Sequence, residues 1–285
     1  MLCVRADRPL DPLTLNVLRA FASACGEARS EYFIVGATAR DILLVGVFGL
    51  PAGRATRDLD IAVAVRDWEQ FAAITGRLVG SGRFVAPAGP PHRLYYRREE
   101  GLPGFPIDLL PFRGAEQTPH RVAWPPDLEV IMSVAGYEDA FAAAEEVELE
   151  PGLTMRVVSL PGLALLKLLA WADAGAQARK HAQDLAVLLA TYADAGNQDR
   201  LYGDEVHCLE VIDYDLELAG ARLLGQDVRR LAGPQALREV QGLLGNAARL
   251  EHLAVQMAGG LPRLDDPEDR ARRLLEQFAS CVRET

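Results

Sequence analysis

The sequence lacks the cysteine and histidine spacings that hold structural metals. Its 285 residues contain four cysteines and five histidines. The cysteines are scattered and form no C-x-x-C pair: Cys3, Cys25, Cys208 and Cys281. Because zinc sites are usually built from closely spaced pairs of such residues, we expect none here. Unpaired thiols persist in a reducing medium, so we expect a cytoplasmic protein without a disulfide framework.

Long apolar segments are also missing. The first residues, MLCVRADRPLDP, do not form the apolar region of a signal peptide. The apolar stretch LALLKLLAWA, residues 163–172, is too short to span a bilayer. We therefore expect no membrane partner. A hydrophobic fraction of 49% and a charged fraction of 25% are ordinary for globular proteins, and 285 residues suffice for two domains.

An excess of positive charge is the third absence. Forty acidic residues against thirty basic ones give a formal net charge of −10. Proteins that wrap long stretches of nucleic acid are usually basic, because they neutralise phosphates. The composition therefore argues against a broad nucleic-acid cradle and leaves room for a small basic patch. Residues 92–98 (HRLYYRR) could stack an acceptor nucleic acid, but an exposed edge strand protected by charges is the favoured interpretation.

Strand patterns dominate the first half of the chain and helical patterns the second. We predict strands at 32–35, 59–65, 93–97 and 107–112, and a hairpin of 147–149 with 155–158. Early helices are expected at 13–28 with Thr14 as the cap, at 37–47, and at 68–79 with Asp67 as the cap, and a loop at 115–126. Later helices are expected at 161–174, 176–192, 213–224, 234–250 and 267–283. This order predicts an α+β fold with domains 1–160 and 161–285.

A glycine joins the first predicted strand to a helix. The strand at 32–35 runs into Gly36 and Ala37, and the helix that follows contains Arg40. Glycine lets a ligand approach the backbone closely, and the first N–H groups of a helix favour a phosphate. The same pattern occurs where glycine serves only the turn, so by itself it is a weak signal.

Two aspartates open the second predicted strand. Side chains two residues apart on a strand point to the same face, so Asp58 and Asp60 project together. Paired carboxylates repel each other, but a Mg²⁺ ion binds to one or two carboxylates plus substrate phosphates. A solvated strand start that merely faces water is the alternative.

Asp108 is an acidic residue within an apolar strand. Aspartate is rarely buried without a partner. If its strand lies beside that of Asp58 and Asp60, the three carboxylates could hold two Mg²⁺ ions. Alone, Asp108 could equally be an ordinary residue at a strand end.

Polar residues also interrupt the predicted helices of the second half. Lys167 lies in a segment that is apolar all round, which predicts a buried helix. Either its side chain reaches the surface along its stem, or it points into a cleft as a charge for a triphosphate. On the next helix a polar stripe of Gln177, Lys180, His181 and Asp184 forms either a solvated face or a nucleotide contact.

Taken together, these motifs resemble the polymerase-β nucleotidyltransferase superfamily and, more narrowly, the AbiEii/MenT-type nucleotidyltransferases. The resemblance rests on residues 35–41 (VGATARD), 57–61 (RDLDI), 107–109 (IDL), 165–171 (LLKLLAW) and 179–185 (RKHAQDL). It covers residues 30–195 and implies a small mixed β-sheet core with flanking helices, followed by a helical part.

The resemblance also implies roles for individual residues. Asp58, Asp60 and Asp108 would bind Mg²⁺ or Mn²⁺. The other implied contacts are with the nucleotide: Gly36, Ala37, Arg40 and Lys167 at phosphates, and Lys180 and Asp184 more weakly. Ala37 departs from the usual glycine or serine, and His181 from a frequent acid.

The implied substrates are an NTP and an acceptor hydroxyl. The acceptor would be the 3′ end of a tRNA or another RNA, as for a toxin with a cognate antitoxin protein, or a small molecule, as in the antibiotic-modifying branch. Two rivals stay open. One is a catalytically silent NTP-binding or antitoxin-docking protein. The other is an unrelated α+β protein in which the three aspartates do not converge.

Overall fold

The structure is a computed structural model of the 285-residue chain. It describes residues 1–28, 30–51, 53, 58–87, 92–98, 102–116, 118, 120–125, 128–129, 131–174, 178–262 and 266–284. These residues pack as two compact units. The sheet unit comprises Met1–Val47, Thr56–Glu138 and Ala144–Val158, and the helical unit comprises Phe48–Ala55, Asp139–Ala143 and Ser159–Thr285. The assignment of two domains divided at residue 160 stays a prediction.

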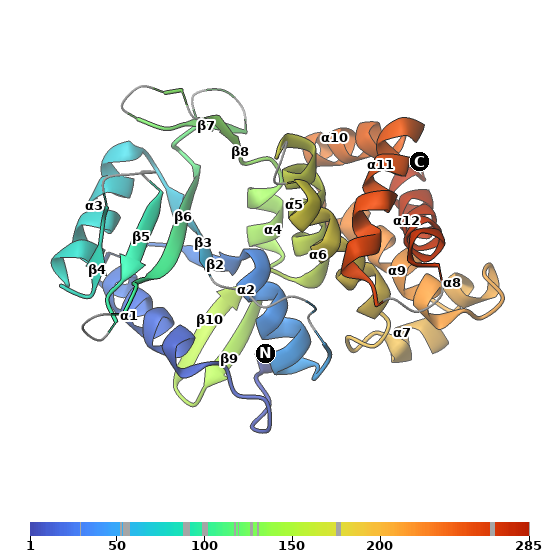
Figure 1. Cartoon of the computed structure of the whole chain (residues 1–285), viewed down its shortest axis with the longest axis horizontal. Helices are drawn as coiled ribbons and strands as arrows, with labels where there is room; N and C mark the ends of the chain where they lie inside the picture. The colour runs from blue at the N-terminus through green and yellow to red at the C-terminus, as the bar shows by residue number, and fades with distance from the viewer. Residues whose placement is uncertain are drawn as a thin grey trace. The chain divides into compact units, whose positions relative to one another are not determined.

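An eight-stranded mixed sheet forms the sheet unit, in the order β1-β9-β10-β2-β3-β6-β5-β4. Its strands are β1 (Leu2–Cys3), β2 (Tyr32–Val35), β3 (Leu59–Val65), β4 (Phe84–Val85), β5 (Arg93–Tyr96), β6 (Phe105–Arg113), β9 (Glu145–Glu150) and β10 (Leu153–Val157). Figure 1 shows β3 and β6 side by side, with β5 beyond β6. The α+β fold predicted from the sequence is confirmed.

The central strand β3 explains why this sheet forms. Apart from Asp60 its residues are apolar, most of them β-branched or small, and all of these are buried. It pairs antiparallel with β2 and parallel with β6. A strand buried on both faces reads as a nearly continuous apolar run, so one acidic residue within it needs a separate reason.

Helices of the sheet unit begin at caps that the sequence only partly reveals. They are α1 (Pro12–Ala28), α2 (Gly36–Asp41), which continues into a π-helix at Ile42–Val47, and α3 (Trp68–Gly80); α4 (Tyr137–Ala142) spans the boundary of the two units. Asp67 caps α3 as predicted, because its carboxylate accepts from the Gln70 N–H. The predicted cap Thr14 is wrong: the Asp11 carboxylate accepts from the Thr14 N–H at 3.0 Å.

The helical unit holds the rest of the described chain. Its elements are α5 (Leu160–Asp173), α6 (Ala178–Thr191), α7 (Gln198–Tyr202), α8 (His207–Glu210), α9 (Leu216–Leu231), α10 (Pro234–Leu244), α11 (Ala247–Met257), a 3-10 turn (Ala258–Gly260) and α12 (Pro267–Arg283). The single helix predicted at 234–250 is wrong, because Gly245 ends α10 and Asn246 caps α11. Over the described residues, none of the helices has the length and hydrophobicity needed to cross a bilayer.

Short elements escaped the sequence analysis. The loop predicted at 115–126 contains β7 (Arg121–Ala123), which pairs with β8 (Ile131–Ser133) as a separate ribbon. The interpretation of residues 92–98 as an edge strand is also wrong, because β5 is covered by β4. A strand of two or three residues offers no periodicity to detect.

Candidate active site

Strand register places three charged side chains in one row across the sheet. Asp60 on β3 lies opposite Asp108 on β6, and Asp108 lies opposite Arg93 on β5. Neighbouring strands are about 4.8 Å apart, and residues paired in this way point to the same face. The row therefore brings together residues that are far apart in the sequence.

Asp58 completes a cluster of three carboxylates. It precedes β3 by one residue and lies two positions before Asp60. One oxygen from each of Asp58, Asp60 and Asp108 lies within 4.8 Å of the others. The rival in which these aspartates do not converge is thereby excluded. Three carboxylates at this spacing are a donor set suited to a hard divalent cation.

Gly36 makes room for this cluster. It has a φ of 69° and follows Val35, which pairs with Asp60. A Cβ built on Gly36 would overlap the Asp60 Oδ2 atom. The Asp60 carboxylate thus lies directly against the backbone at the start of α2, and this position requires glycine on two separate grounds, its φ and its lack of space. Ala37, the next predicted contact, is buried.

Thr38 positions the start of β3 and was missed by the sequence analysis. Its side chain is 7% exposed, and its hydroxyl donates to the Asp58 backbone carbonyl at 2.8 Å. This bond ties α2 to the residue that carries the first carboxylate. The available signal was a hydroxyl residue two positions after the glycine of a strand-to-helix turn.

Arg93 is a second residue that sequence reasoning did not assign to the site. Its guanidinium donates to both oxygens of Asp108, from Nε at 2.7 Å and from Nη2 at 2.6 Å. The Arg93 side chain is 33% exposed and the Asp108 side chain is 13% exposed. Hydrogen bonding to Asp108 raises the pKa of the Arg93 guanidinium, so the arginine stays charged. The signal was an arginine at the start of the strand that precedes Asp108.

Tyr137 lies close to the cluster from α4. Burial, and then the negative charge of Asp60, raise the pKa of the Tyr137 phenol. The phenol is therefore neutral over the physiological pH range. The sequence offered no signal for this residue, because α4 is only six residues long.

Arg40 is buried, whereas an arginine that binds a phosphate from solvent would be exposed. It is fully buried, and its Nη2 and Nε atoms lie 2.7 and 2.9 Å from Oδ1 of Asp41. Its contact with a phosphate stays a prediction. Arg57 and Gln177 of the predicted motifs lie outside the described residues.

Lys167 and Asp184 meet inside the helical unit. The Lys167 Nζ lies 2.6 Å from the Asp184 Oδ2, and the side chains are 8% and 1% exposed. The suggestion that Lys167 reaches the surface is therefore wrong. Lys180 is exposed whereas Asp184 is buried, so the predicted polar stripe is not a single solvated face. The nucleotide contacts of all three residues stay predictions.

A second group of metal-binding residue types lies in the helical unit. Ligand atoms of Glu205, His207 and Cys208 also lie within 4.8 Å of one another. The Glu205 carboxylate already pairs with the guanidiniums of Arg230, at 2.9 Å, and Arg200, at 3.9 Å. Two guanidiniums beside a single carboxylate oppose a divalent cation. Among the described residues, the three aspartates are therefore the better candidate metal centre.

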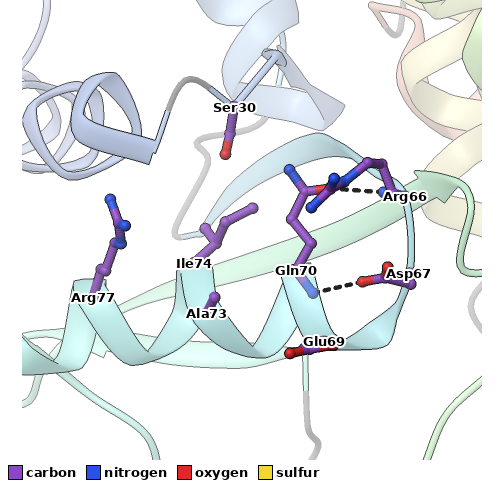
Figure 2. A pocket seen from close by; sticks show the side chains of 8 residues that line it. All are labelled: Ser30, Arg66, Asp67, Glu69, Gln70, Ala73, Ile74 and Arg77. Carbon is purple, nitrogen blue, oxygen red and sulfur yellow. Dashed lines mark hydrogen bonds between the residues drawn. The ribbon is translucent and has the colours of Figure 1, made fainter.

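A cavity of about 290 Å³ follows α3, away from the carboxylates. It is lined by Ser30, Arg66, Asp67, Glu69, Gln70, Ala73, Ile74 and Arg77. Figure 2 shows Arg66 beside Gln70 and Arg77 near the other end of the lining. Arg66 follows the last residue of β3, whereas Asp58 precedes the first, so eight residue steps along the strand separate their backbones by about 26 Å. Two basic and two acidic residues balance the lining, which gives no preference for a charged ligand.

The match to a known protein family defines the class of protein: the chain is a nucleotidyltransferase, and its mixed sheet brings three carboxylates together. More narrowly, residues 21–270 match the family model described as nucleotidyl transferase AbiEii toxin, type IV toxin–antitoxin system. Because this match covers most of its length, the chain belongs to the AbiEii family. The resemblance stated from the sequence is confirmed.

Solved structures with a similar fold are distant. An antigenic nucleotidyltransferase-like protein from Paracoccidioides brasiliensis is 14% identical, with 71% of this chain and 93% of that chain covered and a TM-score of 0.43. ANT(2'')-Ia in complex with adenylyl-2''-tobramycin is 16% identical, with 73% and 97% covered and a TM-score of 0.38. The Thermotoga maritima CCA-adding enzyme complexed with tRNA is 12% identical, with 96% and 82% covered and a TM-score of 0.27. No curated protein sequence matches the chain.

Proposed function

We propose that this nucleotidyltransferase transfers a nucleoside monophosphate from an NTP to an acceptor hydroxyl and uses Asp58, Asp60 and Asp108 to bind Mg²⁺ or Mn²⁺. The observation that carries the proposal is the convergence of these three carboxylates within 4.8 Å. When bound, the divalent ions neutralise phosphate charge and lower the pKa of the attacking hydroxyl. The oxygen-only donor set fits Mg²⁺ or Mn²⁺ better than zinc.

The reaction forms one bond and breaks one. The acceptor oxygen bonds to the α-phosphorus, the bond from that phosphorus to the bridging oxygen of the β-phosphate breaks, and pyrophosphate leaves. Asp108 helps to take the proton of the acceptor hydroxyl. Asp60 lies against the Gly36 backbone, so we place the phosphates at the Gly36 and Ala37 N–H groups.

Other nucleotide contacts are carried over from the family resemblance. Arg40 and Lys167 would offset phosphate charge, and Lys180 and Asp184 would contact the nucleotide more weakly. The buried bond between Lys167 and Asp184 supports a second reading, in which Asp184 holds the lysine in position. A cytoplasmic location suits these substrates.

For the acceptor we propose the 3′ end of tRNA or another RNA, with a cognate antitoxin protein as the partner. The membership in a toxin family supports this choice. The net charge of −10 favours a second candidate, a small-molecule hydroxyl, because it opposes extended RNA binding. A silent NTP-binding or antitoxin-docking protein ranks below both, since all three carboxylates are present.

The test is to incubate the purified protein with Mg²⁺, each labelled NTP in turn and total RNA. An Asp58→Asn/Asp60→Asn variant keeps the side-chain shape and removes the charge. Glu69→Gln, an exposed acid on α3, is the matched control. Label in RNA with the wild type and the control, but not with the double variant, would establish the chemistry and name the nucleotide.

Other outcomes separate the alternatives. Mg²⁺-dependent NTP binding without labelled RNA would indicate a small-molecule or protein acceptor, or a silent protein. If neither binding nor transfer depends on the two aspartates, the proposed function is wrong.

A further inference from the structure

Arg93 holds the carboxylate of Asp108 in the same place where the proposed function needs a metal ligand. The two residues face each other directly across β5 and β6. Both carboxylate oxygens accept from the guanidinium, at 2.7 and 2.6 Å. Bidentate pairs of this kind are among the strongest hydrogen-bonded ion pairs, and the register of two strands builds this one into the sheet.

A divalent cation would compete with this pair. The Asp108 carboxylate lies within 4.8 Å of ligand oxygens of Asp58 and Asp60. A cation bound among them would draw on the same oxygen electron pairs as Arg93, and the two positive charges would repel each other across a few ångströms. Metal binding should therefore weaken the bond between Arg93 and Asp108.

The arginine is the more exposed member of the pair. One third of its side chain is exposed, whereas 13% of Asp108 is. The guanidinium can thus turn toward solvent while the carboxylate stays in the sheet. Its planar fork matches the oxygens of a phosphate as well as those of a carboxylate. A nucleotide that shares the metal with Asp108 would bring such oxygens to the same place.

We infer that Arg93 is a positioning residue that exchanges Asp108 for the phosphates of the nucleotide and so makes metal and nucleotide binding cooperative. The inference rests on the proposed function and adds a reason for nucleotide-dependent metal uptake. Metal binding weakens the bond from Arg93 to Asp108, and Arg93 then binds the phosphates of the nucleotide. By linkage, each ligand raises the affinity for the other by the same factor.

The test measures Mn²⁺ binding from the electron paramagnetic resonance signal of the free ion. It is done first with Mn²⁺ alone, then with the α,β-methylene analogue of the NTP that is transferred. Arg93→Gln removes the competing charge, and Arg93→Lys keeps the charge but cannot hold both oxygens. Arg83→Gln is the control with the same change of charge, since Arg83 is exposed and forms no ion pair within the described part of the chain.

Arg93→Gln is expected to bind Mn²⁺ alone more tightly than the wild type by roughly tenfold or more, because a charged hydrogen bond contributes at least that factor. The analogue should then strengthen Mn²⁺ binding less than it does in the wild type. Arg93→Lys should lie between the two, and Arg83→Gln should match the wild type. Tighter metal binding cannot result from a loss of folded structure.

Unchanged or weaker Mn²⁺ binding by Arg93→Gln would overturn the inference and make Arg93 a brace that holds Asp108 for the metal. If that variant does not fold, Arg93→Lys decides in the same way: binding no tighter than in the wild type overturns the inference. If Asp58→Asn binds Mn²⁺ as tightly as the wild type does, the proposed function itself is wrong, and the inference fails with it.

Discussion

At the scale of single residues, the carboxylate cluster requires a residue without a side chain at position 36. Its φ of 69° favours glycine, and a Cβ there would overlap the Asp60 carboxylate. Any other residue must either displace Asp60 or shift the start of α2. Both changes act on the cluster rather than on the core.

Gly36→Ala is therefore expected to lower nucleotidyl transfer by about a hundredfold or more, because misplacing reacting groups by an ångström can cost that factor. Steady-state transfer and circular dichroism would check it. Gly76→Ala is the matched control, since a Cβ at that helical position meets nothing within 4 Å. The control should keep full activity and gain about 0.5–1 kcal/mol of stability. Equal activity of the two variants would contradict the placement of Asp60.

Lys167 and Asp184 form the most deeply buried ion pair described. Because both side chains are less than 10% exposed, removal of one partner breaks a charged hydrogen bond in a water-poor interior. Lys167→Met should lower the free energy of unfolding by about 1.5–3 kcal/mol. Urea denaturation of Lys167→Met, Asp184→Leu and the double variant would measure it, with the double variant less destabilised than the sum of the singles. Additive losses would show that the pair carries no coupling.

At the scale of elements, the long and regular segments were predictable, and the reason is periodicity. The strand at 59–65 was predicted with the bounds that β3 has, because its residues are β-branched or apolar. Residues 234–250 were predicted as one helix because both halves have a helical pattern. The break between α10 and α11 depends on only two residues, Gly245 and Asn246. The contact of Arg93 with Asp108 depends on a register between strands that no local pattern encodes.

The cap of α3 offers a direct test at this scale. The Asp67 carboxylate accepts from the Gln70 N–H at 2.7 Å. Asp67→Ala should cost about 1 kcal/mol of stability, whereas Asp67→Asn should cost little, because asparagine caps about as well. Thermal denaturation of both variants would measure the difference. Equal losses would mean that the charge of Asp67, rather than its hydrogen bond, supports the helix.

At the scale of the whole molecule, buried acids set the response to alkaline pH. Burial raises the pKa of the Cys25 thiol and of the Tyr32 phenol to about 12, and that of the Cys208 thiol to about 11. These groups lose their protons more readily in the unfolded chain. Above the ordinary thiol pKa of 9.0 the unfolded state therefore binds fewer protons, and stability must fall as pH rises.

We expect the free energy of unfolding to be constant with respect to these groups below about pH 8 and to decrease between about pH 9 and 12. Each group contributes a slope of about 1.4 kcal/mol per pH unit within its own window. Guanidinium denaturation at several pH values would measure this. Cys25→Ala should have a shallower slope, while Cys3→Ala, which removes an exposed thiol, should keep that of the wild type. A stability that rises with pH over this range would contradict the burial of these groups.

The parallel pairing of β3 with β6 also has a consequence for the time at which the enzyme becomes competent. Asp60 and Asp108 are paired although they lie 48 positions apart in the sequence, and contacts between such distant parts of a chain form late and slowly. A nascent or partly folded chain therefore has no complete carboxylate cluster. If the cluster binds Mn²⁺ as proposed, the rate at which a refolding chain binds the ion reports the rate at which β3 and β6 pair.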